Sequence, residues 1–220
     1  GVNVLLVGPM PTPAVAYLVR TMKCGAGVVI SASHNLFQDN GIKFFSKSGF
    51  KLDDKTEEEI EEQVFNNHLE HFRPTADHVG KIKRIDDAQG RYIEFVKATF
   101  PDNLSLSGLK VVVDCANGAA YKVAPLALAE LGATIIPLGV SPNGTNINLD
   151  CGSTCLENIQ QSVIENEAHI GIALDGDGDR AIFIDEKGEM VDGDEILAIC
   201  AKAYAQEGLF RNKVIVGTVM

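Results

Sequence analysis

The sequence predicts an α/β protein in which mixed or parallel sheets lie between helices. Short apolar runs typical of strands alternate with longer segments of helical period along most of the 220 residues. The second half repeats the order strand, helix, strand, helix, strand, which is the pattern of a parallel sheet with helices on its faces. Such sheets bind ligands beyond the carboxyl ends of their strands, so we expect functional residues there.

Composition and charge narrow the classes of function. Hydrophobic residues make up 45% of the chain, which is enough for a substantial core and favours two domains over one. The formal net charge of -11 argues against nucleic acid or an anionic membrane as the main partner, because the basic surface that they require is missing. No apolar run approaches the roughly 20 residues of a membrane helix, and no secretion signal opens the chain. We therefore expect a cytoplasmic protein.

Neither the cysteines nor the histidines form the pattern of a metal site. The five cysteines are odd in number and include no C-x-x-C pair, so neither a disulfide framework nor a zinc site is indicated. A stretch without clear period contains His68, His71 and His78, which we expect to be solvated rather than to bind metal.

The first unit is expected to hold three strands and three helices. The strands are predicted at residues 2–7, 28–30 and 42–45, and the helices at residues 13–23, from residue 56 onward, and at 88–99. Thr12 fits the cap of the first helix, which would begin at Pro13. Thr56 and Glu59 fit a capping box that opens the second helix.

A change of pattern marks the second unit. Residues 100–108, FPDNLSLSG, have the turn residues of a linker. Strands are then predicted at residues 110–115, 133–139 and 169–175, with helices at 119–131 and 156–167 between them. The chain opens on a strand-like run without an initiator methionine and closes on another at residues 213–220. We therefore expect a piece of a larger protein.

The most specific feature is DGDGDR, which follows the third of these strands. The carboxylates of Asp175, Asp177 and Asp179 can converge on one point, because the glycines between them add no side chains to obstruct a bend. Three carboxylates share a site comfortably only with a cation, and oxygen ligands select a hard ion such as magnesium. Arg180 adds a planar guanidinium suited to a phosphate.

Three other interpretations of this loop fit the sequence less well than a magnesium site in an enzyme. A calcium EF-hand is disfavoured, because Arg180 stands where its sixth position requires glycine and the next residues, AIFI, are strand-like. An aspartyl-phosphate enzyme of the haloacid dehalogenase type would use Asp175 as nucleophile and Asp177 as acid. That pattern prefers Thr or Val where Asp179 stands, so it ranks second among the enzymes. A divalent-metal-binding module without catalysis is the non-enzymatic alternative.

A second polar cluster, ISASHN at residues 30–35, ends an apolar strand. A serine hydroxyl carries phosphate well only when other groups neutralise the phosphoryl charge and move the proton. Ser33 can sit at the carboxyl edge of the sheet, and Gly41 lets the chain turn back to bring Lys43 near. Taken alone, the pattern is equally consistent with an ordinary loop, and His34 alone is more typical of a structural histidine.

Together the two loops resemble the α-D-phosphohexomutase superfamily, a group of four-domain enzymes that carry phosphate on a serine. The resemblance rests on ISASHN, NGIKFF and DGDGDR and extends over essentially the whole chain. It implies that Ser33 is the phosphoserine. It also implies Mg²⁺ as the cofactor, with the ligands Ser33, Asp175, Asp177 and Asp179.

The resemblance implies roles for the neighbouring residues as well. Lys43 would be the general base, and Arg180 would contact phosphate. His34 and Asn35 would shape the serine loop, which is the segment ISASHN at residues 30–35, and assist proton transfer. The expected catalytic residues are therefore Ser33, His34, Lys43 and Arg180.

Within the superfamily, NGTNIN, CGST and KGEMVDGDEIL resemble the bacterial branch that interconverts the 6-phosphate and the 1-phosphate of glucosamine. That branch works through a bisphosphate and serves cell-wall precursor synthesis, so a phosphosugar is the expected partner. The resemblance implies phosphohexomutase-like domains at residues 1–101, 106–190 and 191–220, the last being only the start of a third domain. Such a piece is expected to be inactive by itself. A phosphomannomutase or phosphoglucomutase of the same superfamily is the alternative.

Overall fold

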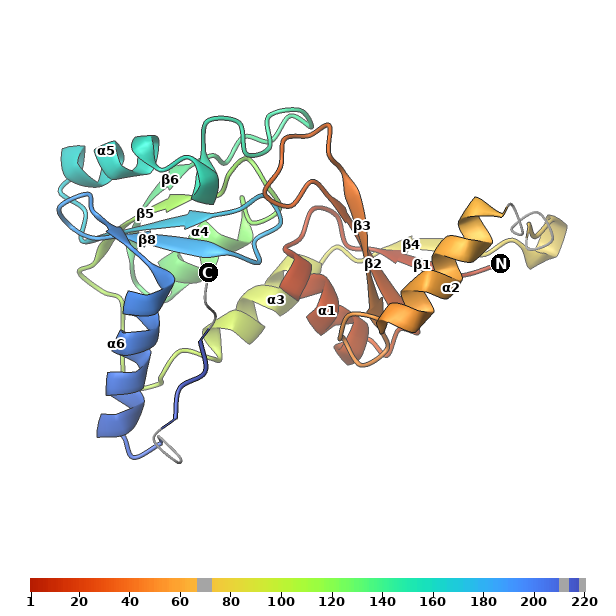
Figure 1. Ribbon diagram of the computed structural model, residues 1–220, viewed down its shortest axis with the longest axis horizontal. Coiled ribbons are helices and arrows are strands. Elements are labelled where there is room, and N and C mark those ends of the chain that lie inside the picture. The colour runs from red at the N-terminus through yellow and green to blue at the C-terminus, as the bar shows by residue number, and fades with distance from the viewer. Residues whose placement is uncertain (67–72, 210–213, 218–220) are drawn as a thin grey trace.

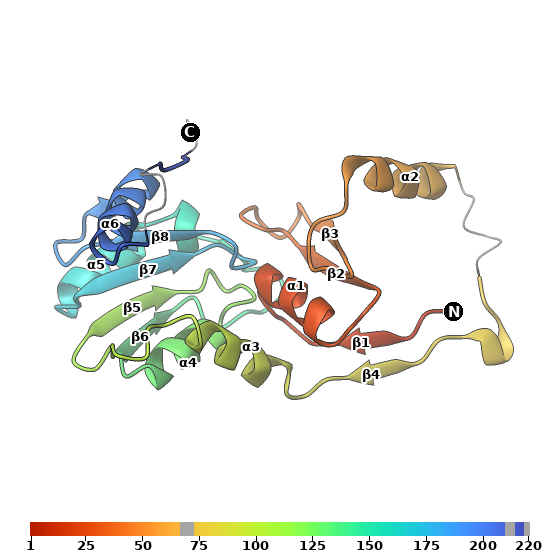
Figure 2. The same ribbon diagram turned by 90° about the horizontal axis from the view of Figure 1, so that it is seen from below.

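The structure is a computed structural model that describes residues 1–66, 73–209 and 214–217. It has two α/β halves that lie side by side along the long axis of the molecule (Figure 1). Helix α3 (Ala88–Lys97) connects them, and the segment expected as a linker follows it without regular structure (Figure 2). No helix in these ranges is both long and apolar enough to span a bilayer.

The first half contains two small pairs of strands. Strand β1 (Val4–Leu6) pairs in parallel with β4 (Ile82–Arg84), and β2 (Ala26–Ser31) pairs antiparallel with β3 (Gly41–Ser46). The register of the second pair sets Ser31 opposite Gly41. The loop between these two residues therefore leaves and re-enters the sheet at one end, which is where ISASHN lies. Helices α1 (Thr12–Thr21) and α2 (Asp54–Phe65) complete this half, with a 3-10 turn at Ala76–His78.

The second half is one five-stranded mixed sheet with the order β6-β5-β7-β8-β9. The strands β5, β6 and β7 are parallel, whereas β8 and β9 run antiparallel to their neighbours. Their bounds are Lys110–Asp114, Thr134–Leu138, Ile170–Leu174, Ala181–Ile184 and Met190–Val191, in chain order. The helices are α4 (Val123–Glu130), α5 (Glu157–Glu165) and α6 (Gly193–Gln206), with a 3-10 turn at Gly152–Thr154.

Strand β5, which lies between β6 and β7, is buried on both faces, as its unbroken run of valines predicts. Val112 packs with Ile159 and Val163 of α5 on one face. Val111 and Val113 lie in a second cluster on the other face, against α4. The two helices therefore cover opposite faces of the sheet, which leaves the carboxyl ends of β5 and β7 for loops.

A third apolar cluster joins the two halves. It contains Ala14 and Leu18 of α1, Ile93 of α3, and Val123 and Ala127 of α4, all buried. Tyr17 and Phe95 stack beside it with ring centroids 4.1 Å apart. This packing sets the N-terminal end of α1 next to the loop that follows β7 (Figure 2).

Several predicted element ends are wrong by a few residues. The N-cap of α1 is Pro11 and not Thr12, and no side chain caps that end. The N-cap of α2 is Asp53, three residues before the expected Thr56, and its carboxylate accepts a hydrogen bond from the backbone N–H of Thr56. Helix α4 begins at Val123 rather than at residue 119, since residues 116–122 form turns.

The other predictions to compare with the structure concern β4, the end of the chain and three histidines. The strand β4 was not predicted, because its three residues alternate too briefly to show a period. The strand expected at residues 213–220 is not formed over residues 214–217, and the rest of it lies outside the described residues. His68 and His71 also lie outside them, while His78 is exposed in its 3-10 turn.

Candidate functional site

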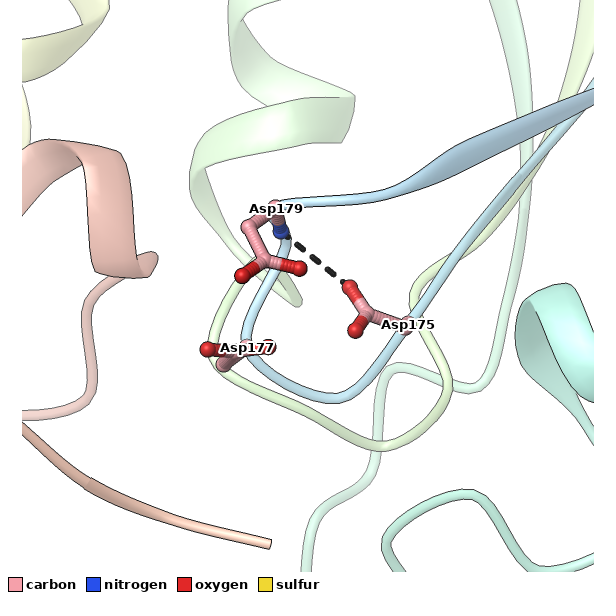
Figure 3. Close-up of side chains that lie close together, drawn as sticks. All are labelled: Asp175, Asp177 and Asp179. Atoms are coloured by element: carbon pink, nitrogen blue, oxygen red, sulfur yellow. Dashed lines mark hydrogen bonds between the residues drawn. The ribbon is translucent and has the colours of Figure 1, made fainter. Parts of the chain in front are cut away.

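The loop DGDGDR connects β7 to β8 in a tight hairpin. Leu174 and Ala181 pair across its base, and the backbone N–H of Asp175 donates to the carbonyl of Arg180. The carboxylate of Asp175 accepts a hydrogen bond from the backbone N–H of Asp179 at 3.1 Å (Figure 3). It accepts another from the backbone N–H of Arg180 at 3.2 Å. Gly178 turns the chain with a φ of +66°, a conformation that favours glycine. The sequence thus folds this loop locally around its first aspartate.

The three carboxylates of the loop lie together, as the sequence predicted. One oxygen from each of Asp175, Asp177 and Asp179 lies within 4.8 Å of the other two. Asp175 and Asp177 are fully buried, and the Oδ2 atom of Asp175 has no hydrogen-bond partner in the described parts of the chain. Burial, and then the charge of Asp177, raise the pKa of Asp175 to about 6. An unpartnered buried oxygen in an all-carboxylate group fits a hard divalent cation such as Mg²⁺.

The serine loop reaches this cluster from the other half of the molecule. Ser33 follows β2 and has a φ of +54°, which is uncommon for a residue with a side chain. Its backbone N–H donates to the hydroxyl of Ser31 at 3.0 Å. Its own hydroxyl Oγ donates to Oδ1 of Asp177, also at 3.0 Å. The two loops that the sequence separates by about 140 residues are therefore in direct contact.

Lys43 completes the contact from β3. Its Nζ lies 2.6 Å from Oδ2 of Asp177, 3.0 Å from Oδ2 of Asp179 and 3.5 Å from Oγ of Ser33. Burial would lower the pKa of Lys43, but hydrogen bonds to the two carboxylates outweigh it and raise the pKa above its ordinary value. Burial would raise the pKa of Asp177, but hydrogen bonds from Lys43 and Thr12 outweigh it and hold the pKa below its ordinary value. The ammonium and the carboxylates therefore stabilise each other's charged forms.

The remaining predicted residues lie at the edge of the cluster. The Arg180 side chain is 59% exposed, and its Nε is 4.0 Å from Oδ1 of Asp179. Its guanidinium is therefore accessible to a ligand in front of the aspartates. His34 is partly buried, and its Nδ1 finds no hydrogen-bond partner in the parts of the chain that the structure describes. The side chain of Asn35 is not tied to the aspartates by any hydrogen bond among the described residues, and its carbonyl accepts one from Asn148.

Sequence reasoning missed two residues of this site. Thr12, which we expected to cap α1, instead donates its hydroxyl hydrogen to Oδ2 of Asp177, and its backbone N–H donates to the carbonyl of Asp177 at 2.8 Å. Asn148 reaches the serine loop from the second half. Pro residues on both sides of Thr12 mark the helix start, but no local pattern points to a partner 165 residues away.

The arrangement suits transfer of a phosphoryl group. It places one hydroxyl, one ammonium and a carboxylate cluster within about 3.5 Å of each other, which is the scale on which positioning controls such reactions. The carboxylates can hold a divalent cation, and the ammonium can move a proton or neutralise charge.

Comparison with known families matches most of the chain. Residues 1–71 match "Phosphoglucomutase/phosphomannomutase, alpha/beta/alpha domain I", and residues 90–188 match domain II of the same family. The phosphoglucosamine mutase of Citrifermentans bemidjiense is 60% identical over all 220 residues, which are 48% of its length. That of Protochlamydia amoebophila is 56% identical over the same span, again 48% of its length. The chain thus spans about half the length of the curated relatives it matches.

Solved structures show the same fold. A phosphoglucomutase/phosphomannomutase family protein from Burkholderia thailandensis aligns with a TM-score of 0.75 at 24% identity, over 94% of this chain and 45% of that one. An N-acetylphosphoglucosamine mutase from Aspergillus fumigatus aligns with a TM-score of 0.54 at 19% identity, over 89% of this chain and 51% of that one.

Proposed function

The chain belongs to the phosphoglucomutase/phosphomannomutase family, and from this premise we propose that it carries the phosphoryl-transfer centre of a phosphoglucosamine mutase. The reaction is the interconversion of glucosamine 6-phosphate and glucosamine 1-phosphate through a sugar bisphosphate. The observation that carries the proposal is the meeting of Ser33, Lys43 and Asp177 across the two halves of the molecule. The choice of sugar is supported by the curated relatives, which are 56% to 60% identical over the whole chain.

In the proposed mechanism, Ser33 carries the phosphate. The bond from phosphorus to the Oγ of Ser33 breaks as a bond forms to a hydroxyl of the sugar phosphate, which becomes a bisphosphate. After the bisphosphate reorients, its other phosphate returns to Ser33, and the second monophosphate leaves. The left-handed backbone at Ser33 and its hydrogen bond to Asp177 fix where the hydroxyl points.

The proton of the sugar hydroxyl is assigned to Lys43. Only the neutral amine accepts a proton, so Lys43 must first release one to solvent, which requires Asp177 and Asp179 to give up their hydrogen bonds to its ammonium. The amine takes the proton of the sugar hydroxyl in the first transfer and returns it to the sugar oxygen that leaves in the second. Magnesium held by Asp175, Asp177 and Asp179 would neutralise the charge on the oxygens of the transferring group. The exposed guanidinium of Arg180 is available to a phosphate of the substrate.

The proposal concerns the complete protein. The chain spans about half the length of its curated relatives, and a mutase must hold the distal phosphate of a bisphosphate while the near one reacts. Loss of such positioning removes many orders of magnitude in rate. We therefore expect the 220 residues alone to bind magnesium without measurable turnover. A phosphosugar is the proposed partner, in the cytoplasm, without nucleic acid or membrane.

The test uses the full-length protein that contains this chain. Incubation with a radiolabelled sugar bisphosphate is expected to label Ser33, and the label should survive hydroxylamine because a phosphoserine does. Ser33→Ala should abolish both the label and the conversion of glucosamine 6-phosphate. Label that persists in Ser33→Ala and is lost to hydroxylamine would instead place an aspartyl phosphate at Asp175.

Assays with the phosphates of glucosamine, glucose and mannose decide the sugar. A higher kcat/KM for glucosamine 6-phosphate supports the proposal. A preference for glucose or mannose phosphate would instead assign to the protein the phosphoglucomutase or phosphomannomutase activity of the same family.

A further inference from the structure

Asn148 makes an unusual pair of contacts with the serine loop. It lies in the loop that follows β6, in the second half of the molecule, and is 6% exposed. Its Nδ2 donates to the carbonyl of Ser33 at 2.8 Å and to the carbonyl of Asn35 at 2.7 Å. Both hydrogens of one amide therefore bind carbonyls on either side of His34, so the turn is held at two points.

The amide orientation follows from these contacts. A flipped amide would set its oxygen against two carbonyl oxygens at under 3 Å, which is repulsive. The Oδ1 atom is buried without a hydrogen-bond partner in the described ranges. The two hydrogen bonds to the serine loop therefore form at the cost of one unsatisfied acceptor. The backbone N–H of Asn148 donates to the carbonyl of Ala116 at 2.9 Å, which ties it to the carboxyl end of β5.

The loop that Asn148 holds is conformationally strained. Ser33 has a φ of +54°, a left-handed backbone conformation in which its Cβ crowds the neighbouring carbonyl oxygen. Inside the loop, the N–H of Asn35 donates to the carbonyl of Ala32 at 2.9 Å. The carbonyl of Ser33 also lies so close to Gly176 that a Cβ there would collide with it. Contacts from the second half therefore surround this carbonyl.

From these contacts we propose that Asn148 is a positioning residue for phosphoryl transfer. Its side chain forms no hydrogen bond with the hydroxyl of Ser33 or with the three aspartates. It acts through the carbonyls of Ser33 and Asn35, which it holds so that the left-handed turn persists and the hydroxyl of Ser33 points at Asp177. The effect of Asn148 on the reaction rate rests on the proposed function. Its hold on the serine loop is independent of that function.

Two variants of the full-length protein separate the amide donors from the backbone. Asn148→Asp keeps the size of the side chain but sets a carboxylate oxygen against two carbonyls. Asn148→Gly removes the donors and accepts a positive φ without strain, so it serves if the aspartate variant does not fold. Asn146→Asp is the matched control, because Asn146 is in the same loop and its amide donates to the carbonyl of Ser141 instead.

For kinetics, Asn148→Asp is expected to lower kcat about 100-fold and Asn148→Gly about tenfold, with KM and magnesium affinity changed less than about threefold. Asn146→Asp should stay near wild type. A merely structural role would lower the melting temperature and the active fraction but leave kcat per folded molecule unchanged. Unchanged kcat in both Asn148 variants would overturn the proposal.

Amide hydrogen exchange supplies a readout that needs no mutase activity. The N–H of Asn35, bonded to Ala32, is expected to exchange at least about tenfold faster in both Asn148 variants than in wild type or Asn146→Asp. If wild type lacks mutase activity, the proposed function fails, and this exchange still decides whether Asn148 holds the loop. Unaltered exchange at Asn35 would refute the hold itself.

Discussion

Asp177 is the residue on which the two halves converge. It is fully buried and receives hydrogen bonds from the side chains of Thr12, Ser33 and Lys43, all of which belong to the first half. A buried carboxylate is costly unless it is paired and hydrogen-bonded, and these donors satisfy it. One residue of the second half therefore sets the place of three residues of the first.

Removal of the Thr12 hydroxyl tests this dependence. Thr12→Val keeps the shape of the side chain but leaves Asp177 with one donor fewer, so we expect magnesium affinity to fall about tenfold. The free energy of unfolding should fall by about 1–3 kcal/mol, because a buried charged group loses a partner. Thr12→Ser, which retains the hydroxyl, is the control for calorimetric titration and urea unfolding. Equal affinities in the two variants would contradict the role of Thr12.

The cysteines offer a second test at this scale. Burial, with the nearby charge of Asp114, raises the pKa of the Cys115 thiol to about 12, whereas Cys200 is exposed on α6. Alkylation by iodoacetamide at about pH 8 requires the thiolate, so native protein should be modified at Cys200 and not at Cys115. Peptide mass spectrometry before and after unfolding in urea measures both. Native modification of Cys115 at the rate of Cys200 would show that the β5 end is open to solvent.

Among the elements, the starts of α1 and α2 have different functions. The start of α2 is an ordinary cap, in which Asp53 accepts from the N–H and the hydroxyl of Thr56. The start of α1 lacks a side-chain cap, and the hydroxyl and N–H of its Thr12 bind Asp177 instead. A helix terminus leaves unpaired N–H groups, so it can serve either local structure or a distant loop.

The α2 cap predicts a pH dependence. Hydrogen bonds from Thr56 lower the pKa of Asp53, so its stabilisation is complete above the pKa of the unfolded carboxyl and disappears as the pH falls through the lower folded value. Asp53→Ala should speed amide exchange in the first turn of α2 at neutral pH. Asp53→Asn keeps an uncharged cap, so the advantage of wild type over it should vanish as the pH falls below the unfolded pKa of about 4 and through the lower folded pKa. An advantage that persists at the lowest pH would contradict this assignment.

The whole molecule is held together by the cluster of α1, α3 and α4 and by the contact of the two loops. Lys97 of α3 adds ion pairs to Glu94 and to Glu130 of α4, both at 2.7 Å. A ligand that binds the aspartate cluster binds the folded protein, because the three carboxylates converge only when the loop between β7 and β8 is formed. Its binding energy therefore adds to the stability of the folded chain.

Magnesium is therefore expected to stabilise the 220-residue chain. At a free concentration about 100 times its dissociation constant, the free energy of unfolding should rise by about 2.7 kcal/mol. Asp177→Asn should abolish the increase. Asp86→Asn, with the same charge change at an exposed residue, should preserve it and controls for the net charge of -11. Urea unfolding followed by circular dichroism measures all three proteins. A wild-type chain insensitive to magnesium would contradict the metal assignment.

The sequence by itself determined the α/β class, most strands and helices, and the cluster of three aspartates. These features are local: apolar period sets the elements, and alternate glycines let the carboxylates of one hairpin converge. The resemblance of its two loops to one superfamily brought in Ser33 and Lys43 as partners of that hairpin. The structure places both residues there, within hydrogen-bonding distance of Asp177.

Only the tertiary structure decided which further residues reach the site. Thr12 is 165 positions from Asp177 and Asn148 is 115 from Ser33, and neither has a local signal of its partner. Their contacts depend on the packing of α1 against α3 and α4 and on where the loop after β6 crosses the serine loop. Short-range patterns specify backbone conformation, whereas long-range contacts follow from how the whole core packs. For this reason, the sequence indicated the chemistry of the centre, and the fold decided which side chains position it.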